Sequence, residues 1–208
     1  MPLPISENSG SGNFKKVPPG THRAVCNLVV DLGPQRTNWQ GQESVKPQVY
    51  LRWETPDERV EYEKNGQKHE GPLSIGAIYT ASLSEKATLR HILESWRGKG
   101  FTQDELKSFD LFNVLGKPCL ITVTHKESNG KVYANIVSVT ALPKGMVPPK
   151  AENPLLKYSA DESDSFKALP EWLQKKVQEQ VRSTIAGEDD AGTSNGSTPP
   201  PFDDDIPF

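Results

Sequence analysis

The 208-residue sequence has few of the residues on which several classes of protein depend. Its two cysteines, Cys26 and Cys119, lie far apart in apolar β-like stretches, with no neighbouring Cys or His at metal-ligand spacing. The four histidines are scattered and form no HExxH-like pair. These shortages exclude a disulfide framework and give no support to a metal or acid–base site. We therefore expect buried, reduced thiols, no metal and no cofactor.

Long hydrophobic runs are also missing. No stretch approaches the roughly 18 apolar residues that a membrane helix needs, and the first residues lack the basic-then-apolar order of a signal peptide. Apolar residues make up 34% of the chain, whereas glycine (16) and proline (18) are abundant. We therefore expect a cytoplasmic protein with one core and further segments that do not join it.

Charge is divided between two parts of the chain. Residues 1–150 contain 19 Lys and Arg against 15 Asp and Glu, whereas residues 151–208 contain 5 against 12. The first part is therefore net basic (+4) and the second net acidic (−7). This separation favours a basic surface for a polyanion and an acidic tail that competes for that surface or recruits another protein.

Hydrophobic patterns predict five strands and one main helix. The strands are expected over residues 21–33, 48–54, 72–83, 117–127 and 131–142, with a polar loop over 34–47 and hairpin turns at Asn65-Gly66 and Ser128-Asn129-Gly130. Between the third and fourth strands, helical spacing predicts a helix with Ser84 as N-cap and Gly98 or Gly100 as its end. A capping box at Thr102–Glu105 predicts a second, short helical turn.

This order of elements predicts the fold. Five strands with a helix between strands 3 and 4 are typical of the OB fold, a partly open barrel that binds oligonucleotides on the face of strands 2 and 3. We therefore predict a mainly β protein with an OB-fold barrel over residues 21–142. An SH3-like barrel or a small sandwich also fits the strands, but neither explains the mid-chain helix as simply.

Four further segments are expected outside the barrel. Residues 1–20 are predicted to be a flexible arm, and the proline-rich, acidic residues 143–168 a linker. A helix is expected over 169–186, with Leu169, Leu173, Val177, Val181 and Ile185 in one apolar stripe. It either docks on the barrel or pairs with its copy in an oligomer. Residues 187–208 contain no Lys or Arg and too few apolar side chains to fold, so we expect a disordered acidic tail.

The chain ends in PPPFDDDIPF. Its final six residues resemble the acidic tip of bacterial single-stranded DNA-binding proteins, which end in Asp-Asp-Asp-Ile-Pro-Phe after a disordered linker. The resemblance implies that Phe208 and Ile206 enter an apolar pocket of a replication, recombination or repair enzyme, while Asp203, Asp204 and Asp205 meet its basic rim. Pro207 limits the backbone freedom of the tip and so lowers the entropy cost of binding.

The remainder of the chain does not follow the bacterial pattern. The N-terminal arm, the segment from Gly33 to Pro47 and the helices with Trp96 and Trp172 all differ from it. The layout resembles instead the OB-fold single-strand binders of bacteriophages, which pair a divergent barrel with a similar tail. This second resemblance concerns the architecture alone.

Binding of a single strand without sequence preference needs cations for the phosphates and flat rings for the bases. Trp39 in a polar loop, and Tyr50 and Arg52 on the polar face of the second strand, meet this need, whereas Trp53 and Trp96 lie on apolar faces and are expected in the core. Tyr79 is in register with core residues but is kept as a candidate. The predicted interface comprises Arg36, Trp39, Lys46, Tyr50, Arg52, Tyr62, Lys64, Lys68, Tyr79, Lys126, Lys131 and Tyr133, with Lys15 and Lys16 as candidates for a flexible basic clamp.

The sequence therefore favours a non-catalytic protein that binds single-stranded DNA and recruits partner enzymes through its tip. The main alternative is an interaction protein or decoy, whose tail mimics the bacterial tip and whose barrel binds protein instead of DNA. A small nuclease ranks third, because its metal would need clustered carboxylates in a preorganised site. The densest acidic stretches, residues 57–63 and the tail, do not have that character.

Overall fold

The computed structural model describes residues 15–39, 41–64, 66–160 and 163–181, without the side chains of residues 39, 64, 163 and 164. Four predictions therefore lie outside the described residues. They are the flexibility of residues 1–14, the last residues of the 169–186 helix, the disorder of the 187–208 tail and the conformation of the Asp203–Phe208 tip.

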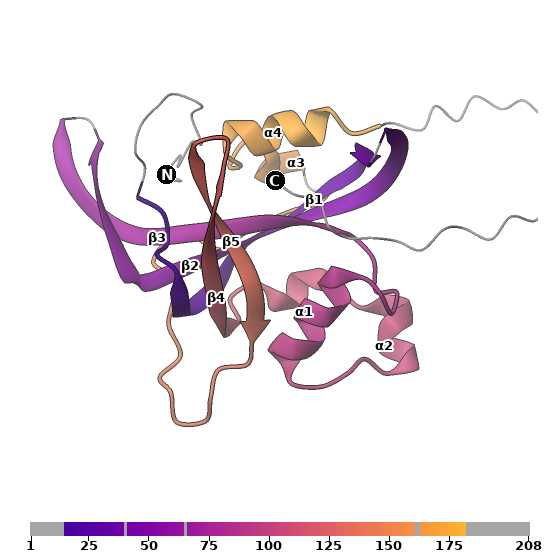
Figure 1. Ribbon diagram of the computed structural model, residues 1–208, viewed down its shortest axis with the longest axis horizontal. Coiled ribbons are helices and arrows are strands. Elements are labelled where there is room, and N and C mark those ends of the chain that lie inside the picture. The colour runs from indigo at the N-terminus through magenta and orange to yellow at the C-terminus, as the bar shows by residue number, and fades with distance from the viewer. Residues whose placement is uncertain (1–14, 40, 65, 161–162, 182–208) are drawn as a thin grey trace, which may run out of the picture.

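Six strands form one curled sheet (Figure 1). Five of them are antiparallel in the order β3-β2-β1-β4-β5, and a short sixth strand pairs in parallel with β1. Their bounds are β1 Gly20–Trp39, β2 Gln42–Lys64, β3 Gln67–Thr80, β4 Pro118–Ser128, β5 Lys131–Thr140 and β6 Leu156–Tyr158. Residues 20–25 of β1 pair with β4 and residues 25–39 pair with β2, so β1 is the central strand of the curl.

The predicted fold class is confirmed. The sheet is a half-barrel with an OB-like strand order, and its edge strands β3 and β5 contact each other. Three helical elements lie between β3 and β4, where the helix was predicted: α1 (Thr88–Arg97), α2 (Gln103–Ser108) and η1 (Leu111–Val114). Gly98 ends α1 in a left-handed conformation (φ 68°), as expected. The predicted N-cap at Ser84 is wrong, because α1 begins four residues later, at Thr88, after Ala87.

The inner face of the sheet holds the main core under α1. Trp53 is fully buried and Trp96 is 6% exposed, and the two rings pack with their centroids 5.9 Å apart, so both predictions of core tryptophans are confirmed. Cys26 and Cys119 are buried free thiols in the same core, which also agrees with the sequence. Burial raises the pKa of the Cys26 thiol to about 12.

The outer face of the sheet carries a second core. Leu28, Val30 and Leu32 project there from β1, because β1 is bulged at Asn27. Two C-terminal helices, α3 (Ser163–Phe166) and α4 (Glu171–Gln178), lie over this face (Figure 1), and β6, which pairs with β1, adds Tyr158 to the same core. Helix α4 therefore docks on the barrel, the first of the two arrangements that the sequence left open.

The linker predicted over 143–168 is wrong in its second half. Residues 156–158 form β6, and α3 follows within the same segment, because Tyr158 and Phe166 join the outer core. The predicted 169–186 helix is wrong at both ends: α4 begins at Glu171, after Pro170, and ends at Gln178, so residues 179–181 are not helical. Its apolar stripe is confirmed for Leu169, Leu173 and Val177, which are all buried.

Two further predictions of irregular chain are wrong. The loop expected over 34–47 is a two-stranded ribbon in which Gln35 pairs with Lys46 and Trp39 with Gln42. The arm expected over 1–20 is docked from Lys15 onward, since Val17 is only 1% exposed and its carbonyl accepts a hydrogen bond from His125 Nε2 (2.8 Å). The alternation of polar and apolar residues does not reveal an isolated ribbon such as 34–47, because both faces of the ribbon meet water to a similar extent.

Candidate nucleic-acid interface

Helix α4 covers Tyr50, one of the two residues that the sequence placed at the centre of the binding face. Tyr50 is 8% exposed, and its ring meets that of Trp172 edge-on at 5.0 Å. The ring lies across Gly76, where a Cβ would be 2.1 Å from the Tyr50 hydroxyl oxygen. The prediction that Tyr50 offers an exposed ring is therefore wrong, because α4 occupies the space that a base would need.

Arg52 projects from β2 on the same side as Tyr50. Its Nε donates to Asn27 Oδ1 (3.1 Å), and burial lowers the pKa of its guanidinium, although the nearby Glu54 carboxylate opposes this shift. A half-buried arginine that already bonds to a neighbouring strand is part of the packing of the sheet. Its predicted role as an exposed phosphate ligand is therefore not supported by its position.

Tyr79 belongs to the inner core. It is 9% exposed, and its ring lies edge-on to Trp53 at 6.5 Å. Desolvation by burial raises the pKa of its hydroxyl. Tyr79 was kept as a DNA-binding candidate, and its burial overturns that assignment.

The ribbon formed by the ends of β1 and β2 carries three predicted site residues. Arg36 pairs with the exposed Val45, whereas Lys46 pairs with the buried Gln35, so the two cations lie on opposite faces of the ribbon. Arg36 and Lys46, both predicted for the interface, therefore do not form one cationic surface around Trp39. The Trp39 side chain lies outside the described part of the structure. Arg36 is exposed and remains accessible to a phosphate.

The β2–β3 hairpin extends beyond the barrel at one end of the molecule (Figure 1). Tyr62 pairs with His69 across it, and the two rings stack with centroids 5.6 Å apart and planes inclined by 20°. The sequence prediction missed His69. The two-residue turn at Asn65-Gly66 could have identified it, because that turn brings Tyr62 opposite His69.

The other face of this hairpin carries Lys68, which is exposed. It pairs with Glu63, and Glu61 pairs with Glu70 on the same face. Lys68 is therefore surrounded by carboxylates that would repel a phosphate backbone. The Lys64 side chain lies outside the described residues. The aromatic face of the hairpin, formed by Tyr62 and His69, fits a base better than the charged face fits a phosphate.

The β4–β5 hairpin unites three predicted site residues on one face. Lys126 pairs with Tyr133, and Ser128 pairs with Lys131, so these side chains point to the same side of the hairpin. The predicted turn is confirmed, since Asn129 and Gly130 both have positive φ (52° and 71°). We call this surface, with Thr124 and Asn135, the β4–β5 basic face. Both lysines are exposed, and Glu127, the one carboxylate of the hairpin, alternates to the opposite face.

One of the two lysines of the predicted basic clamp is held by a hydrogen bond. Lys15 Nζ donates to the carbonyl of Arg59 (2.6 Å), while Lys16 is exposed. The Arg59 guanidinium in turn meets the carboxylates of Glu152 (2.5 Å) and Glu70 (3.5 Å). Lys15 is therefore fixed at the base of the β2–β3 hairpin rather than on a free arm.

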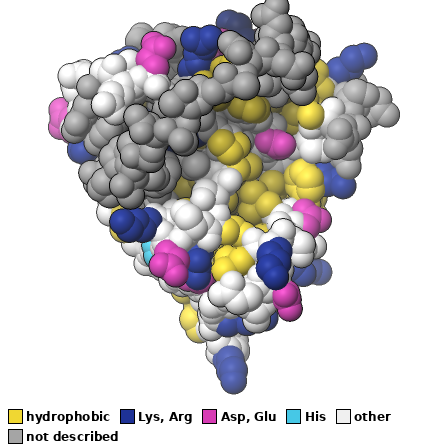
Figure 2. Space-filling view, turned by 90° about the vertical axis from the view of Figure 1, so that its right-hand side faces the viewer, with side chains coloured by type: hydrophobic (Ala, Val, Ile, Leu, Met, Phe, Trp, Pro, Cys, Tyr) yellow, Lys and Arg dark blue, Asp and Glu magenta, His cyan; other side chains and the backbone are white. Residues whose placement is uncertain are grey.

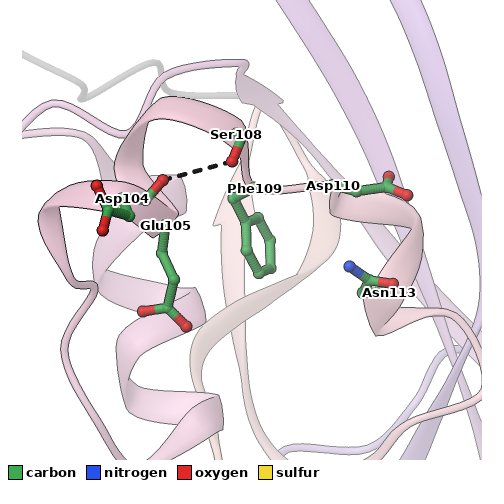
Figure 3. A pocket seen from close by; sticks show the side chains of 6 residues that line it. All are labelled: Asp104, Glu105, Ser108, Phe109, Asp110 and Asn113. Atoms are coloured by element: carbon green, nitrogen blue, oxygen red, sulfur yellow. Dashed lines mark hydrogen bonds between the residues drawn. The ribbon is translucent and has the colours of Figure 1, made fainter.

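A surface hollow between α2 and η1 has a different character (Figure 3). Its walls are formed by Asp104, Glu105, Ser108, Phe109, Asp110 and Asn113. Three carboxylates around one ring make it unsuitable for a phosphate backbone. Within the described ranges, no group of three or more His, Cys, Asp or Glu residues could hold a metal ion.

The described Lys and Arg side chains on the side of the molecule at the right of Figure 1 form no continuous basic track either. Figure 2 shows hydrophobic side chains gathered in a hollow on this side, with Lys, Arg, Asp and Glu scattered around it. A single strand needs a row of cations along its phosphates. Among the described surfaces, the β4–β5 basic face is thus the best match to that requirement.

The fold and these surfaces define a mainly β, OB-like protein with basic and aromatic hairpins around a half-barrel. No protein-family model matches the chain, and no curated protein matches it either. No helix among the described residues is long and apolar enough to cross a membrane.

Proposed function

We propose that this protein binds single-stranded DNA, largely independently of sequence, during DNA replication, recombination or repair. In this proposal it also recruits partner enzymes through the tip Asp203–Phe208. One observation carries the proposal: a single chain joins an OB-like half-barrel to a terminal Asp-Asp-Asp-Ile-Pro-Phe. The protein acts without catalysis or a cofactor, in the cytoplasm, and in the host cell if a bacteriophage encodes it.

The β4–β5 basic face supports the DNA-binding part of the proposal. Lys126 and Lys131 supply two cations for phosphates, and Tyr133, opposite Lys126 on the same face, supplies a ring for a base. A stacked base is worth roughly 1 to 3 kcal/mol regardless of its identity. The stacked rings of Tyr62 and His69 offer a second platform. Binding by charge and stacking would depend little on sequence.

The composition of the tip supports the recruiting part. Ile206 and Phe208 are apolar anchors, and the three aspartates beside them speed the encounter with a basic pocket. Pro207 reduces the entropy that the tip loses on binding. The spacer before it is rich in Gly, Ser and Pro.

One observation favours a second candidate, a decoy that mimics the bacterial tip and does not bind DNA. The outer face of β2, part of the strand 2–3 surface on which OB folds bind oligonucleotides, is occupied at Tyr50 by α4. A barrel whose usual ligand face is closed has less surface for a strand. The decoy would bind the enzymes that recognise the bacterial tip but would ignore oligonucleotides.

Anisotropy of a fluorescent oligo-dT distinguishes the two candidates. We expect the full chain to bind at low salt, and the double variant Lys126→Ala, Lys131→Ala to bind several-fold more weakly. The matched control is Lys144→Ala, Lys150→Ala, which removes the same charge from exposed positions in the loop between β5 and β6. Absence of binding in dilute buffer would refute DNA binding and favour the decoy. Equal losses in both double variants would refute the assignment to the β4–β5 basic face.

A further inference from the structure

Helices α3 and α4 lie over the outer face of the sheet, and β6 and the Glu152–Asn153 bend, which precede them in the chain, are held beside β1 and β2. We call this set the C-terminal cover. Its apolar contribution is large, because Leu169, Leu173 and Val177 are buried against β1 residues that are themselves fully buried. Without the cover, Leu28, Val30 and Leu32 of β1 would face water, which would expose a large apolar patch.

A buried carboxylate fastens the start of the cover. Glu54 on β2 is 0% exposed, and its two oxygens accept four hydrogen bonds from other segments. The donors are the backbone N–H of Glu152 (2.6 Å) and Asn153 (3.2 Å), the Asn153 side chain (2.7 Å) and the Asn27 side chain (3.1 Å). A buried carboxylate is stable only when such donors satisfy it, so removing the cover would leave Glu54 with one of these partners.

A second polar contact fastens the end of the cover. Gln35 Nε2 donates to the carbonyls of Leu32 (2.7 Å) and Lys176 (3.0 Å), and the Val181 N–H donates to the Pro34 carbonyl (2.8 Å). Gly33 has φ +67°, and a Cβ there would lie 2.3 Å from Gln180 Oε1. The bulge at Gly33 is thus shaped around the end of the cover.

We propose that the C-terminal cover is a permanent occupant of the outer sheet face, and that it excludes single-stranded DNA from this face and directs the strand to the hairpins. The inference rests on the proposed function for its DNA-binding part. The position of the C-terminal cover also determines where the chain after Val181 leaves the fold. Val181 lies beside Pro34, at the root of the β1–β2 ribbon, whereas the β2–β3 hairpin extends at the opposite end of the molecule (Figure 1). The partner-docking tail and the Tyr62–His69 platform therefore start from different ends.

Hydrogen–deuterium exchange of the full chain, with and without oligo-dT, tests this inference. In the free protein, we expect the amides of α4 and β6 to be protected together with those of β1. Oligo-dT should slow exchange in the β4–β5 hairpin and in the β2–β3 hairpin, and leave α4 and β6 unchanged. Faster exchange of α4 or β6 on adding oligo-dT would mean that DNA displaces the cover, and would overturn the proposal.

The same experiment separates this inference from the proposed function. No change at any amide with oligo-dT would refute DNA binding, while unprotected α4 amides in the free protein would refute a permanent cover on their own. Two variants weaken the first polar contact: Glu54→Gln, and the milder Asn153→Ala, which removes one donor. Both should speed exchange of residues 152–158 and leave β4 and β5 unchanged. The control Asn113→Ala, at an exposed position on η1, should change neither.

Discussion

Replacing Leu173 by alanine tests whether α4 is an integral part of the fold. Leu173 is 0% exposed, and it packs with Leu28, Val30 and Leu32 in the outer core. The change removes three methylene-sized groups, which are worth about 0.8 kcal/mol each, or about 2.4 kcal/mol together. The cavity left in a packed core raises this cost, so we expect a loss of about 3 to 4 kcal/mol in the free energy of unfolding.

Urea denaturation followed by circular dichroism measures this loss. Because domains of this size have total stabilities of about 5 to 15 kcal/mol, the midpoint should fall markedly while the transition stays single. The control is Gln178→Ala on the same helix, where the side chain is exposed and the change should stay within about 0.5 kcal/mol. A loss below about 1 kcal/mol for Leu173→Ala, or a separate early transition for α4, would refute the integral role of the helix.

Three further predictions concern binding and pH. Tyr133→Ala should weaken oligo-dT binding by roughly 1 to 3 kcal/mol in anisotropy titrations, whereas Tyr133→Phe keeps the ring and should bind nearly normally; equal losses would argue against stacking. Deleting residues 199–208 removes three aspartates and should strengthen binding at low salt only, so identical curves at all salt concentrations would contradict tail competition. The pKa of the Cys26 thiol is about 12 in the folded protein against a reference value of 9.0, so the unfolded state loses this proton first as pH rises. The free energy of unfolding should therefore fall from about pH 9 toward pH 12, by up to about 1.4 kcal/mol per pH unit. Cys26→Ala should flatten this slope in denaturation experiments, and an unchanged slope would contradict the assignment.

Features fixed by short-range chemistry could be predicted from the sequence. The turn at Asn129-Gly130 needs two residues with positive φ, and these two residue types tolerate it. The capping box of α2 was also predicted correctly, since the Thr102 side chain accepts from the Glu105 N–H and the Glu105 carboxylate accepts from the Thr102 N–H. Neither feature depends on any distant part of the chain.

Features that depend on distant contacts could not be predicted in the same way. The alternation of polar and apolar residues in β2 correctly predicts that Tyr50 faces away from the inner core. Whether that outer face meets water depends on α4, which follows more than a hundred residues later. The signal that was available lies in β1: its almost uninterrupted apolar run over 24–30 is typical of a strand buried on both faces. The run therefore required a cover, and the apolar stripe of the C-terminal helix was the natural candidate.

The cover also limits how strongly salt can act on DNA binding. Of the cations in the predicted interface whose side chains the structure describes, four are exposed: Arg36, Lys68, Lys126 and Lys131. Each phosphate contact on a single strand contributes about 0.7 to the slope of log affinity against log salt, so these four allow a slope of about −3. Adding Lys46 and Lys64 extends the limit to about −4. A salt titration with a steeper slope would require further cations, such as the exposed Lys16 or the half-buried Arg52.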